Sequence, residues 1–294
     1  MFMKTFSSLF LAALLVLSFA SCKHEIKDDG TTDNTPTDTT DISKNLLAKT
    51  TLTTTAGVTT QTFRYDAQNR LVWYGNTSTV PGYFEDTSKI VWDANGHISK
   101  IIYSSDTSRK FPDPKLDSVV YNVFYDAAAS KYTYKLVKYK AFTTSFKDSI
   151  VYGYDGTRIS KEEMYYFDYG KTNTYIKYGL STYAYNADGD LNDQKTTYYN
   201  VDNSNTDYSY ELAFTYNDKG VNLLNLGNEA ILIGLPDYYS GHILRTAGGS
   251  YPQSPQFNSN YSFTYKFNTK YRPLTADVSD AVSNTKGTMA YSYQ

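Results

Sequence analysis

Apolar and polar residues alternate along most of the chain beyond its first 45 residues. Between positions 208 and 217, Tyr, Leu and Phe occupy every second place, and the places between them carry Ser, Glu, Ala, Thr and Asn. Positions 261 to 268 repeat this alternation. Successive side chains of a strand point to opposite faces, so a period of two indicates a strand. The pattern predicts antiparallel strands with one buried and one solvated face.

A turn motif recurs between these strands. An aromatic residue is followed by Asp or Asn and then, usually, by a short run ending in Gly, a basic residue and an aliphatic residue. The seven copies begin at Tyr65, Trp92, Tyr125, Tyr154, Tyr185, Tyr216 and Phe267. The Asp or Asn side chain can accept hydrogen bonds from the amides ahead of it. Gly96, Gly189 and Gly220, or Asn69 in the first copy, tolerate the left-handed backbone of a type I turn with a bulge. Each copy therefore predicts a tight hairpin turn.

The spacing of the copies predicts the architecture. Successive aromatic positions lie 27, 33, 29, 31, 31 and 51 residues apart. A period of about 30 residues indicates one supersecondary unit that cannot bury its apolar face alone. We predict an all-β, antiparallel up-and-down meander of about fourteen strands, with residues 287–294 as a possible closing strand. Closure as a barrel or flattened barrel is favoured, since an open sheet of this size leaves two long edges.

The side chains of a closed barrel this wide cannot fill its interior, because a barrel of about eight strands is the widest whose interior the inward-facing side chains fill. Something must occupy the lumen, or the barrel must flatten. The long interval between the sixth and seventh copies, residues 226–260, is one irregular insertion with a compact apolar run that does not alternate. Asn228 is a candidate cap for a short helix through Gly234. The insertion is predicted to be either a plug in the barrel or a long surface loop.

The first 21 residues are predicted to be a signal peptide. Lys4 supplies a positive charge, and the apolar run from Leu9 to Phe19 is too short to span a bilayer. The sequence Phe-Ala-Ser-Cys ending at Cys22 resembles the lipobox of bacterial lipoproteins, in which the Cys is lipidated, with palmitate among the acyl chains expected. The alternative is an ordinary secretory signal followed by an unrelated Cys. Since Cys22 is the only cysteine, the exported domain has no disulfide.

The signal and its surroundings predict domains and localisation. Residues 22–45 are expected to be a lipidated Cys with a flexible polar stalk, and residues 46–294 the β-hairpin repeat domain. The resemblance to lipoproteins implies an anchor in the outer membrane, with the periplasmic or cell-surface side left open. Charged residues fall on both faces of the return strands, at 161–163 and 192–195. A spanning barrel needs an uninterrupted apolar outer band, so the membrane is predicted as a partner through the lipid anchor only.

The repeat itself has relatives. The copies starting at Tyr65 and Trp92 resemble the tyrosine–aspartate (YD) repeats of Rhs-type shells and teneurins, although the period here is longer and the copies are fewer. The combination of lipobox, polar stalk and repeats is similar to a group of envelope lipoproteins described as a domain of unknown function with a porin-like fold. That resemblance implies a barrel and supplies no catalytic residues.

Composition and motifs narrow the chemistry. With 28 basic and 30 acidic residues the net charge is −2, and no basic stripe exists to bind nucleic acid. The three histidines show no metal-ligand spacing, and no catalytic motif or cofactor-binding loop is present. Glu162 and Glu163 are adjacent in a strand and must point to opposite faces, so they cannot share a site. We predict no enzyme activity, no cofactor and no metal.

The remaining candidates for binding are aromatic. Tyr238, Tyr239, His242 and Arg245 crowd one part of the insertion, where Tyr rings suit sugars or peptides. The alternative is that these rings only pack the insertion onto the barrel. The functional hypothesis is a lipid-anchored, non-enzymatic envelope protein that binds or scaffolds a glycan or an envelope protein. A carrier of an apolar or glycan ligand inside the barrel is the alternative. A polysaccharide-acting enzyme is less favoured, because it needs two carboxylates about 5–9 Å apart in one cleft.

Overall fold

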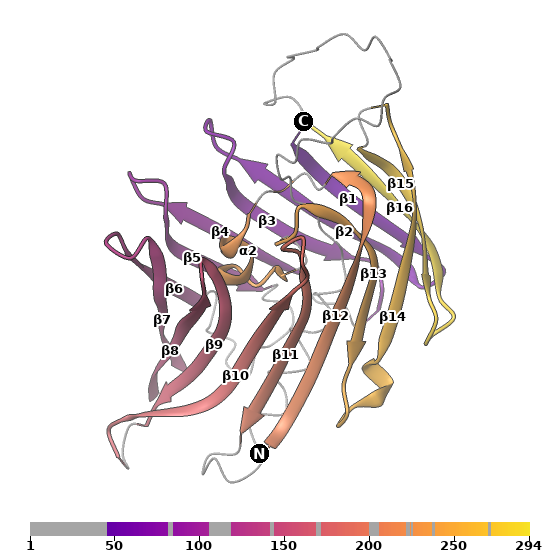
Figure 1. The fold of residues 1–294 in the computed structure, drawn as a ribbon. Coiled ribbons are helices and arrows are strands. Elements are labelled where there is room, and N and C mark those ends of the chain that lie inside the picture. Colours follow the sequence, from indigo (N-terminus) through magenta and orange to yellow (C-terminus); the bar gives the residue numbers. More distant parts are fainter. Residues whose placement is uncertain are drawn as a thin grey trace.

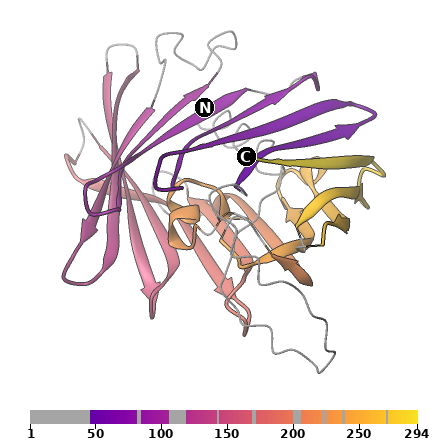
Figure 2. The same cartoon turned by 90° about the horizontal axis from the view of Figure 1, so that it is seen from above.

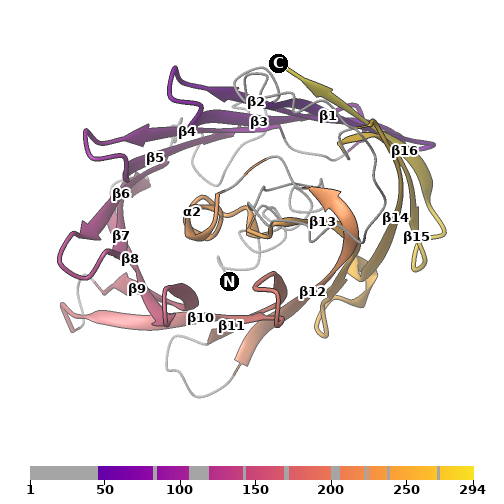
Figure 3. The same ribbon diagram turned by 45° about the horizontal axis from the view of Figure 1, so that its top comes forward.

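The computed structural model describes residues 46–81, 85–105, 119–141, 144–168, 172–199, 206–221, 224, 226–236, 239–269 and 272–294. The signal peptide, Cys22, the stalk and Tyr238 lie outside these ranges. Over the described residues one antiparallel sheet closes into a barrel (Figures 1 and 3). Every strand pairs with its neighbours in sequence, and β1 pairs with β16. The predicted fold class, a closed up-and-down meander, is confirmed.

The strands are β1 (Leu47–Thr54), β2 (Gly57–Tyr65), β3 (Leu71–Ser78), β4 (Asp86–Trp92), β5 (Ile98–Ser105), β6 (Val119–Asp126), β7 (Lys131–Ala141), β8 (Thr144–Asp155), β9 (Arg158–Phe167), β10 (Tyr175–Tyr185), β11 (Leu191–Tyr199), β12 (Thr206–Val221), β13 (His242–Ser250), β14 (Ser259–Phe267), β15 (Pro273–Asp280) and β16 (Lys286–Tyr293). The helices are α2 (Asn228–Leu232) and the 3-10 turn η3 (Pro255–Phe257). In the described part of the chain, neither helix has the length and apolar character to cross a membrane.

The turn chemistry of the motif is confirmed in the hairpins. In the first copy, Asp66 Oδ1 accepts hydrogen bonds from the backbone amides of Gln68 and Arg70, both at 2.9 Å. The Asp or Asn of the second, third, fifth and seventh copies accepts hydrogen bonds from amides ahead of it in the same way. Asn69, Gly96 and Gly189 have φ values of 61°, 84° and 91°, the left-handed conformation that the turn requires.

Each copy of the motif also contains a β-bulge in one fixed place. In the first copy Tyr65 pairs with Leu71 and Arg64 pairs with Trp73, so Val72 is the extra residue. In every later copy the extra residue likewise follows the residue that pairs with the motif aromatic. That residue is aliphatic in most copies, Tyr132 in the third and Pro273 in the seventh. The other extra residues are Ser99, Thr133, Ser160, Asn192, Arg245 and Leu274. A repeated bulge increases the local twist at one end of the sheet and so favours its closure.

The aromatic residue of the motif joins neighbouring hairpins. In the copies that begin with Trp92, Tyr154, Tyr185 and Tyr216, the polar atom of this residue donates a hydrogen bond to the backbone carbonyl of the residue that follows the tight turn of the preceding hairpin. Trp92 Nε1 donates to Leu71 O at 2.8 Å, and Tyr185 and Tyr216 donate to Ile159 O and Leu191 O at 2.5 Å. Tyr154 donates to Tyr132 O at 2.9 Å. The aliphatic side chains themselves are almost fully buried. The copies that begin with Tyr or Trp and form this bond thus fasten one hairpin to the next at the tight-turn end, whereas Phe267 of the seventh copy has no polar atom and cannot form it.

An eighth copy is divided between the two ends of the described chain. Tyr293 pairs with Leu47, and Ala48 is the extra residue of the shift that follows. Tyr65 OH donates to Leu47 O at 2.9 Å, and Tyr293 OH donates to Pro273 O at 2.5 Å. Figure 2 shows the indigo β1 and the yellow β16 side by side. The seven complete copies supply fourteen strands, and the divided copy supplies β1 and β16, so the barrel has sixteen.

The sixth copy departs from the prediction. The motif copy that begins at Tyr216 predicts a tight turn through Gly220, but β12 continues to Val221. Tyr216 pairs instead with Leu244, after an irregularity in which Asn217 pairs with Ile243 and Val221 with His242. The return strand of this hairpin is therefore β13, and residues between β12 and β13 are an insertion into the turn. This insertion accounts for the spacing of 51 residues between the sixth and seventh copies.

The predicted division between buried and solvated faces is confirmed. On β12, Tyr210, Leu212 and Phe214 are buried, whereas Glu211 and Thr215 are exposed. In a closed barrel the buried face is the lumen. The outer face of the wall carries exposed charged side chains on many strands. They include Lys49, Arg64, Lys89, Lys161, Lys195, Glu211, Lys266 and Asp277.

The bond between neighbouring hairpins can be tested at Tyr65. We expect Tyr65→Phe to lower the free energy of unfolding by about 1–2 kcal/mol, because the part-buried Leu47 carbonyl loses its donor. Urea unfolding followed by circular dichroism measures the change. Tyr134→Phe, which alters an exposed tyrosine on β7, is the matched control and should stay within about 0.5 kcal/mol. Equal effects of the two variants would show that the bond does not stabilise the barrel.

Candidate functional site

The insertion after β12 enters the barrel. Figure 3 shows α2 inside the ring of strands, and Ala230, Ile231 and Leu232 are almost completely buried. Residues 226–236, which we call the plug, thus fill part of a lumen that the wall alone cannot fill. The predicted cap is wrong in detail: Gly227 is the N-cap residue. Asn228 instead accepts a hydrogen bond from Ile159 N and donates one to Thr157 O, at 3.0 and 2.8 Å.

Polar side chains of the wall hold the plug from different sides. Tyr74 on β3 donates to Ile233 O at 3.1 Å, and Lys135 on β7 donates through Nζ to Leu232 O at 2.9 Å. Tyr132 donates to the carboxylate of Glu229 at 3.0 Å. Burial raises the pKa of Glu229, and the Tyr132 hydroxyl opposes that shift. The bonds from Tyr74 and Lys135 satisfy carbonyls at the C-terminal end of α2 that no helical turn follows.

One stretch of the lumen wall carries a group of buried polar side chains beside the plug. We call Lys135, Tyr152, Glu162, Tyr183 and Gln194 the lumen site. They lie on β7, β8, β9, β10 and β11, five strands that neighbour one another in the sheet. Tyr152 pairs directly with Glu162, and Tyr183 pairs directly with Gln194. Side chains in such positions on one face are within reach of each other.

The lumen site contains a buried ion pair. Lys135 Nζ lies 3.8 Å from Glu162 Oε1, and both side chains are about nine-tenths buried. Tyr183 OH donates to Glu162 Oε2 at 2.6 Å. Burial lowers the pKa of Lys135, although the Glu162 carboxylate opposes this shift. Burial and the same carboxylate raise the pKa of Tyr183 well above its ordinary value, so its hydroxyl remains a donor.

Several polar atoms of the lumen site have no hydrogen-bond partner among the described residues. They are Tyr152 OH, Glu162 Oε1 and Gln194 Oε1. Gln194 Nε2 donates to Thr196 Oγ1 at 3.4 Å, so one end of the amide is satisfied and the other is not. Leaving a buried polar group unpaired costs about 1–3 kcal/mol. Such atoms are uncommon in folded proteins and call for an explanation, such as an ordered water, an ion or a functional role.

A second polar group lies on the wall formed by β3, β4 and β5. Asn76 Nδ2 donates to Asp86 Oδ1 at 2.7 Å, and Tyr103 OH lies 3.5 Å from Asp86 Oδ2. Asn76 Oδ1 has no partner among the described residues. Burial raises the pKa of Asp86 to about 6, against the hydrogen bonds from Asn76 and Tyr103. This carboxyl group therefore titrates close to neutral pH.

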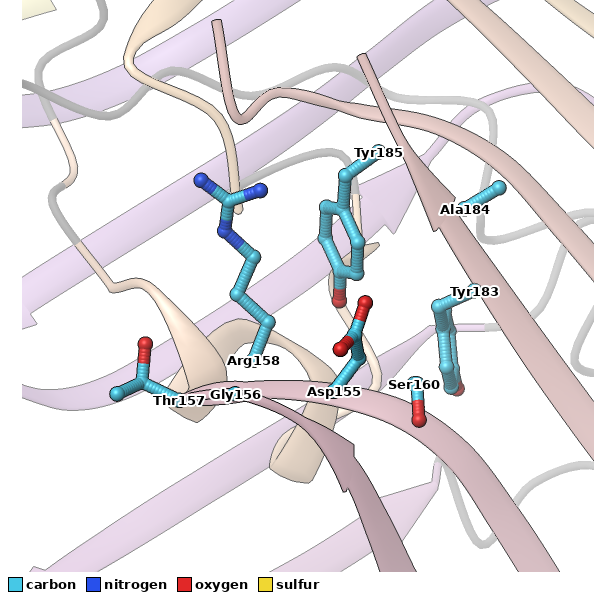
Figure 4. Close-up of a pocket in the computed structure, with 8 residues that line it drawn as sticks. All are labelled: Asp155, Gly156, Thr157, Arg158, Ser160, Tyr183, Ala184 and Tyr185. Carbon is cyan, nitrogen blue, oxygen red and sulfur yellow. The ribbon is translucent and has the colours of Figure 1, made fainter. Parts of the chain in front are cut away.

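A pocket of about 360 Å³ opens at the tight-turn end, beside the β8–β9 hairpin (Figure 4). Its lining includes Asp155, Arg158, Tyr183 and Tyr185. The Arg158 guanidinium lies over the Tyr185 ring, 5.4 Å from its centroid. Tyr183 belongs to both the pocket lining and the lumen site.

The candidate binding residues predicted from the insertion make different contacts in the structure. The Tyr239 ring packs against Tyr185 with centroids 4.9 Å apart. His242 Nδ1 lies 2.7 Å from Asp190 Oδ2, which ties the start of β13 to the β10–β11 turn. The Arg245 side chain is exposed and occupies the bulge of β13. Tyr239 and His242 thus contact the wall, as the packing alternative expected, and their binding role remains a prediction.

No sequence motif predicts the lumen site, although the alternation of buried and exposed positions carries a signal for it. Glu162 was correctly placed on the opposite face from Glu163, which pairs with Lys177 at 2.8 Å. A charged residue that shares the parity of buried neighbours such as Met164 must point into the lumen. Lys135 likewise shares the parity of buried Val137. No three His, Cys, Asp or Glu side chains in the described ranges converge as metal ligands.

Comparisons with known proteins find solved structures with a similar fold, two of which are porin-like proteins. No protein-family model and no curated protein matches this sequence. A solved structure of a porin-like protein from Bacteroides vulgatus ATCC 8482 is similar, with a TM-score of 0.48 and 14% identity over 85% of this chain and 99% of that chain. A porin-like protein from Bacteroides uniformis ATCC 8492 has a TM-score of 0.46 and 10% identity over 84% and 98%. The strand pairing of this chain, rather than either similarity, establishes its fold.

The raised pKa of Asp86 predicts a pH-dependent stability. The folded-state pKa of about 6 lies above the ordinary value of 3.8, so the folded protein binds more protons between these values and loses stability as pH rises through them. We expect Asp86→Asn to raise the free energy of unfolding at pH 7 by about 1–3 kcal/mol and to have little effect near pH 3.5. Urea unfolding at both pH values measures this.

Asp66→Asn is the matched control for that experiment. Although burial opposes it, hydrogen bonds from Arg70 lower the pKa of Asp66, so its charge stabilises the fold above its ordinary pKa. Asn keeps the turn, since Asn186 and Asn268 occupy this place in other copies. The control should lose stability at pH 7, the opposite sign. A loss of stability in Asp86→Asn at pH 7 would contradict the assignment of a buried, destabilised carboxylate.

Proposed function

We propose that the protein is a lipid-anchored, non-enzymatic binding protein of the cell envelope, whose plugged barrel takes a polar ligand in its lumen. The observation that carries this proposal is the set of buried lumen atoms without a hydrogen-bond partner among the described residues, Tyr152 OH, Glu162 Oε1 and Gln194 Oε1. A wall built only for stability gains nothing from these atoms, because apolar side chains of similar shape avoid their desolvation cost.

The chemistry of the outer face supports an anchored rather than a spanning barrel. Lys161, Lys195 and Glu211 lie on the outward faces of β9, β11 and β12, and their side chains are exposed. A Lys side chain on a lipid-facing strand costs about 2–4 kcal/mol at the middle of the bilayer, and a Glu side chain costs less. A lipid on Cys22, linked through the polar residues 23–45, attaches such a domain to a membrane without burying its wall.

The arrangement of carboxylates supports binding rather than hydrolysis. A glycosidase needs two carboxylates that face one cleft. Glu162 points into the lumen, where Tyr183 and Lys135 hold it, whereas Glu163 pairs with Lys177 on the outer face. The lumen site therefore offers one carboxylate that is already neutralised by a lysine, which suits recognition of a ligand.

The anchor is tested at Cys22. We expect the wild-type protein to sediment with membranes and to enter the detergent phase in Triton X-114 partitioning. Cys22→Ser should move it to the soluble or aqueous fraction, because the lipid contributes the membrane affinity. Ser21→Ala, one residue before the acylation site, is the matched control and should keep its membrane location. A Cys22→Ser protein that still requires detergent for extraction would contradict the anchor.

Binding in the lumen is tested on the full-length protein from native membranes. We expect aqueous or organic extracts of the denatured protein to contain a compound that is lost after unfolding and refolding in clean buffer. Mass spectrometry of paired extracts identifies it. The refolded, empty protein should melt at a lower temperature, because a bound ligand stabilises the folded state. Empty extracts together with identical melting temperatures would contradict the proposed function.

A further inference from the structure

We infer that the lumen site binds a neutral saccharide. This inference rests on the proposed function and specifies its ligand class. It combines three features of the wall that no single motif of the sequence displays. They are the hydrogen-bonding character of the unpartnered atoms, the balance of charge around them, and a row of tyrosine rings on the adjoining strands.

The atoms without a hydrogen-bond partner require a ligand that has many hydrogen-bond donors and can also accept hydrogen bonds. Glu162 Oε1 and Gln194 Oε1 are acceptors, and Tyr152 OH can donate and accept. Lys135 Nζ has three protons, donates one to Leu232 O and lies 3.8 Å from Glu162 Oε1, so its protons are shared between the plug and the carboxylate of the site. Every hydroxyl of a sugar both donates and accepts, and neighbouring hydroxyls are close enough to serve adjacent side chains.

The charge of the site excludes strongly charged ligands. Lys135 and Glu162 neutralise each other at 3.8 Å within the buried wall. An anion would have to compete with Glu162 for Lys135, and a cation would have to compete with Lys135 for Glu162. Either exchange leaves one buried charge without its partner, which is strongly unfavourable. A neutral polar ligand keeps the ion pair intact.

A row of tyrosine rings continues from the lumen site. We call Tyr178, Tyr198, Tyr208, Tyr210 and Tyr251 the tyrosine row. Successive ring centroids lie 6.3, 6.4, 6.4 and 5.8 Å apart. Tyr178 and Tyr198 are stacked with an angle of 13° between their planes. Tyr198 follows Gln194 on β11 with the same inward parity, so the row and the lumen site adjoin.

The tyrosine row suits the apolar faces of sugar rings. A Tyr ring offers a flat apolar surface and a hydroxyl at its edge, and a pyranose offers C–H groups on its faces and hydroxyls at its edge. A fatty acyl chain would also cover the rings. It would nevertheless leave Tyr152 OH, Glu162 Oε1 and Gln194 Oε1 without a hydrogen bond in a dry site, which is unfavourable. The apolar ligand among the sequence hypotheses is therefore disfavoured.

The experiment uses full-length lipidated protein in lauryldimethylamine oxide, a detergent without a sugar headgroup. The labelled protein is applied to an array of neutral and acidic glycans, and dissociation constants for bound glycans are measured by titration calorimetry. Phosphatidylglycerol vesicles and palmitate serve as lipid probes. We expect binding to neutral glycans, with no more than background binding to the acidic glycans or the lipid probes.

Tyr152→Phe and Gln194→Leu test the position of the ligand. Each removes a buried polar atom that has no partner among the described residues, so both variants should fold and melt at or above the wild-type temperature. Each should weaken glycan binding by about 3- to 10-fold, the effect of losing one hydrogen bond. Tyr134→Phe, on the outer face, is the matched control and should bind like the wild type.

The outcomes separate this inference from the proposed function. Weaker binding in both lumen variants with an unchanged control supports the saccharide site. Equal binding in all variants places the sugar elsewhere and overturns the inference. Binding of only acidic glycans or lipid probes overturns the saccharide class, while a compound recovered from the native protein would still support ligand binding in the lumen. No probe bound and empty extracts would overturn both.

Discussion

The hydrogen bond that a motif Tyr or Trp donates to a carbonyl of the preceding hairpin is the interaction that recurs around the barrel, with Phe267 of the seventh copy as an exception that has no donor. Backbone pairing alone permits strands to slip, because the ladder is nearly the same in every register. A side chain that reaches across a hairpin to one particular carbonyl removes that freedom. Tyr185 bonded to Ile159 O and Tyr216 bonded to Leu191 O set the register of successive hairpins. The bulge beside each aliphatic residue adds the twist that closure requires.

Closure follows from the same interaction. Leu47 and Tyr293 form the divided eighth copy, and Tyr65 and Tyr293 connect it to its two neighbours. The ring of repeats is therefore complete although the chain is interrupted, and no sheet edge remains exposed at the β1–β16 pair. Leu47 and Tyr293, near the two ends of the described chain, lie at the tight-turn end of the barrel.

The plug is a consequence of barrel width. Sixteen strands enclose more space than wall side chains fill, and the insertion into the turn of the sixth copy supplies apolar side chains from within. The plug does not bring polar partners for the whole wall. Lys135 donates to Leu232 O, while Glu162 Oε1 and Tyr152 OH have no hydrogen-bond partner among the described residues. The proposed binding site therefore lies on the part of the lumen wall whose polar side chains the plug does not fully pair.

The sequence by itself determined the strands, the turns and the two faces of the sheet. Those features depend on neighbours in the chain, such as Asp66 accepting from Arg70 N, or on parity, as for Glu162 and Glu163. Only the tertiary structure decided which carbonyl each aromatic reaches, that Leu47 and Tyr293 complete a copy, and that the turn expected at Gly220 opens into the plug. The lumen site also depends on tertiary structure, because Lys135, Tyr152, Glu162, Tyr183 and Gln194 lie on five strands. These five side chains occupy inward-facing positions on their strands. They form one buried surface because the sheet closes, and their spacing along the chain does not predict this.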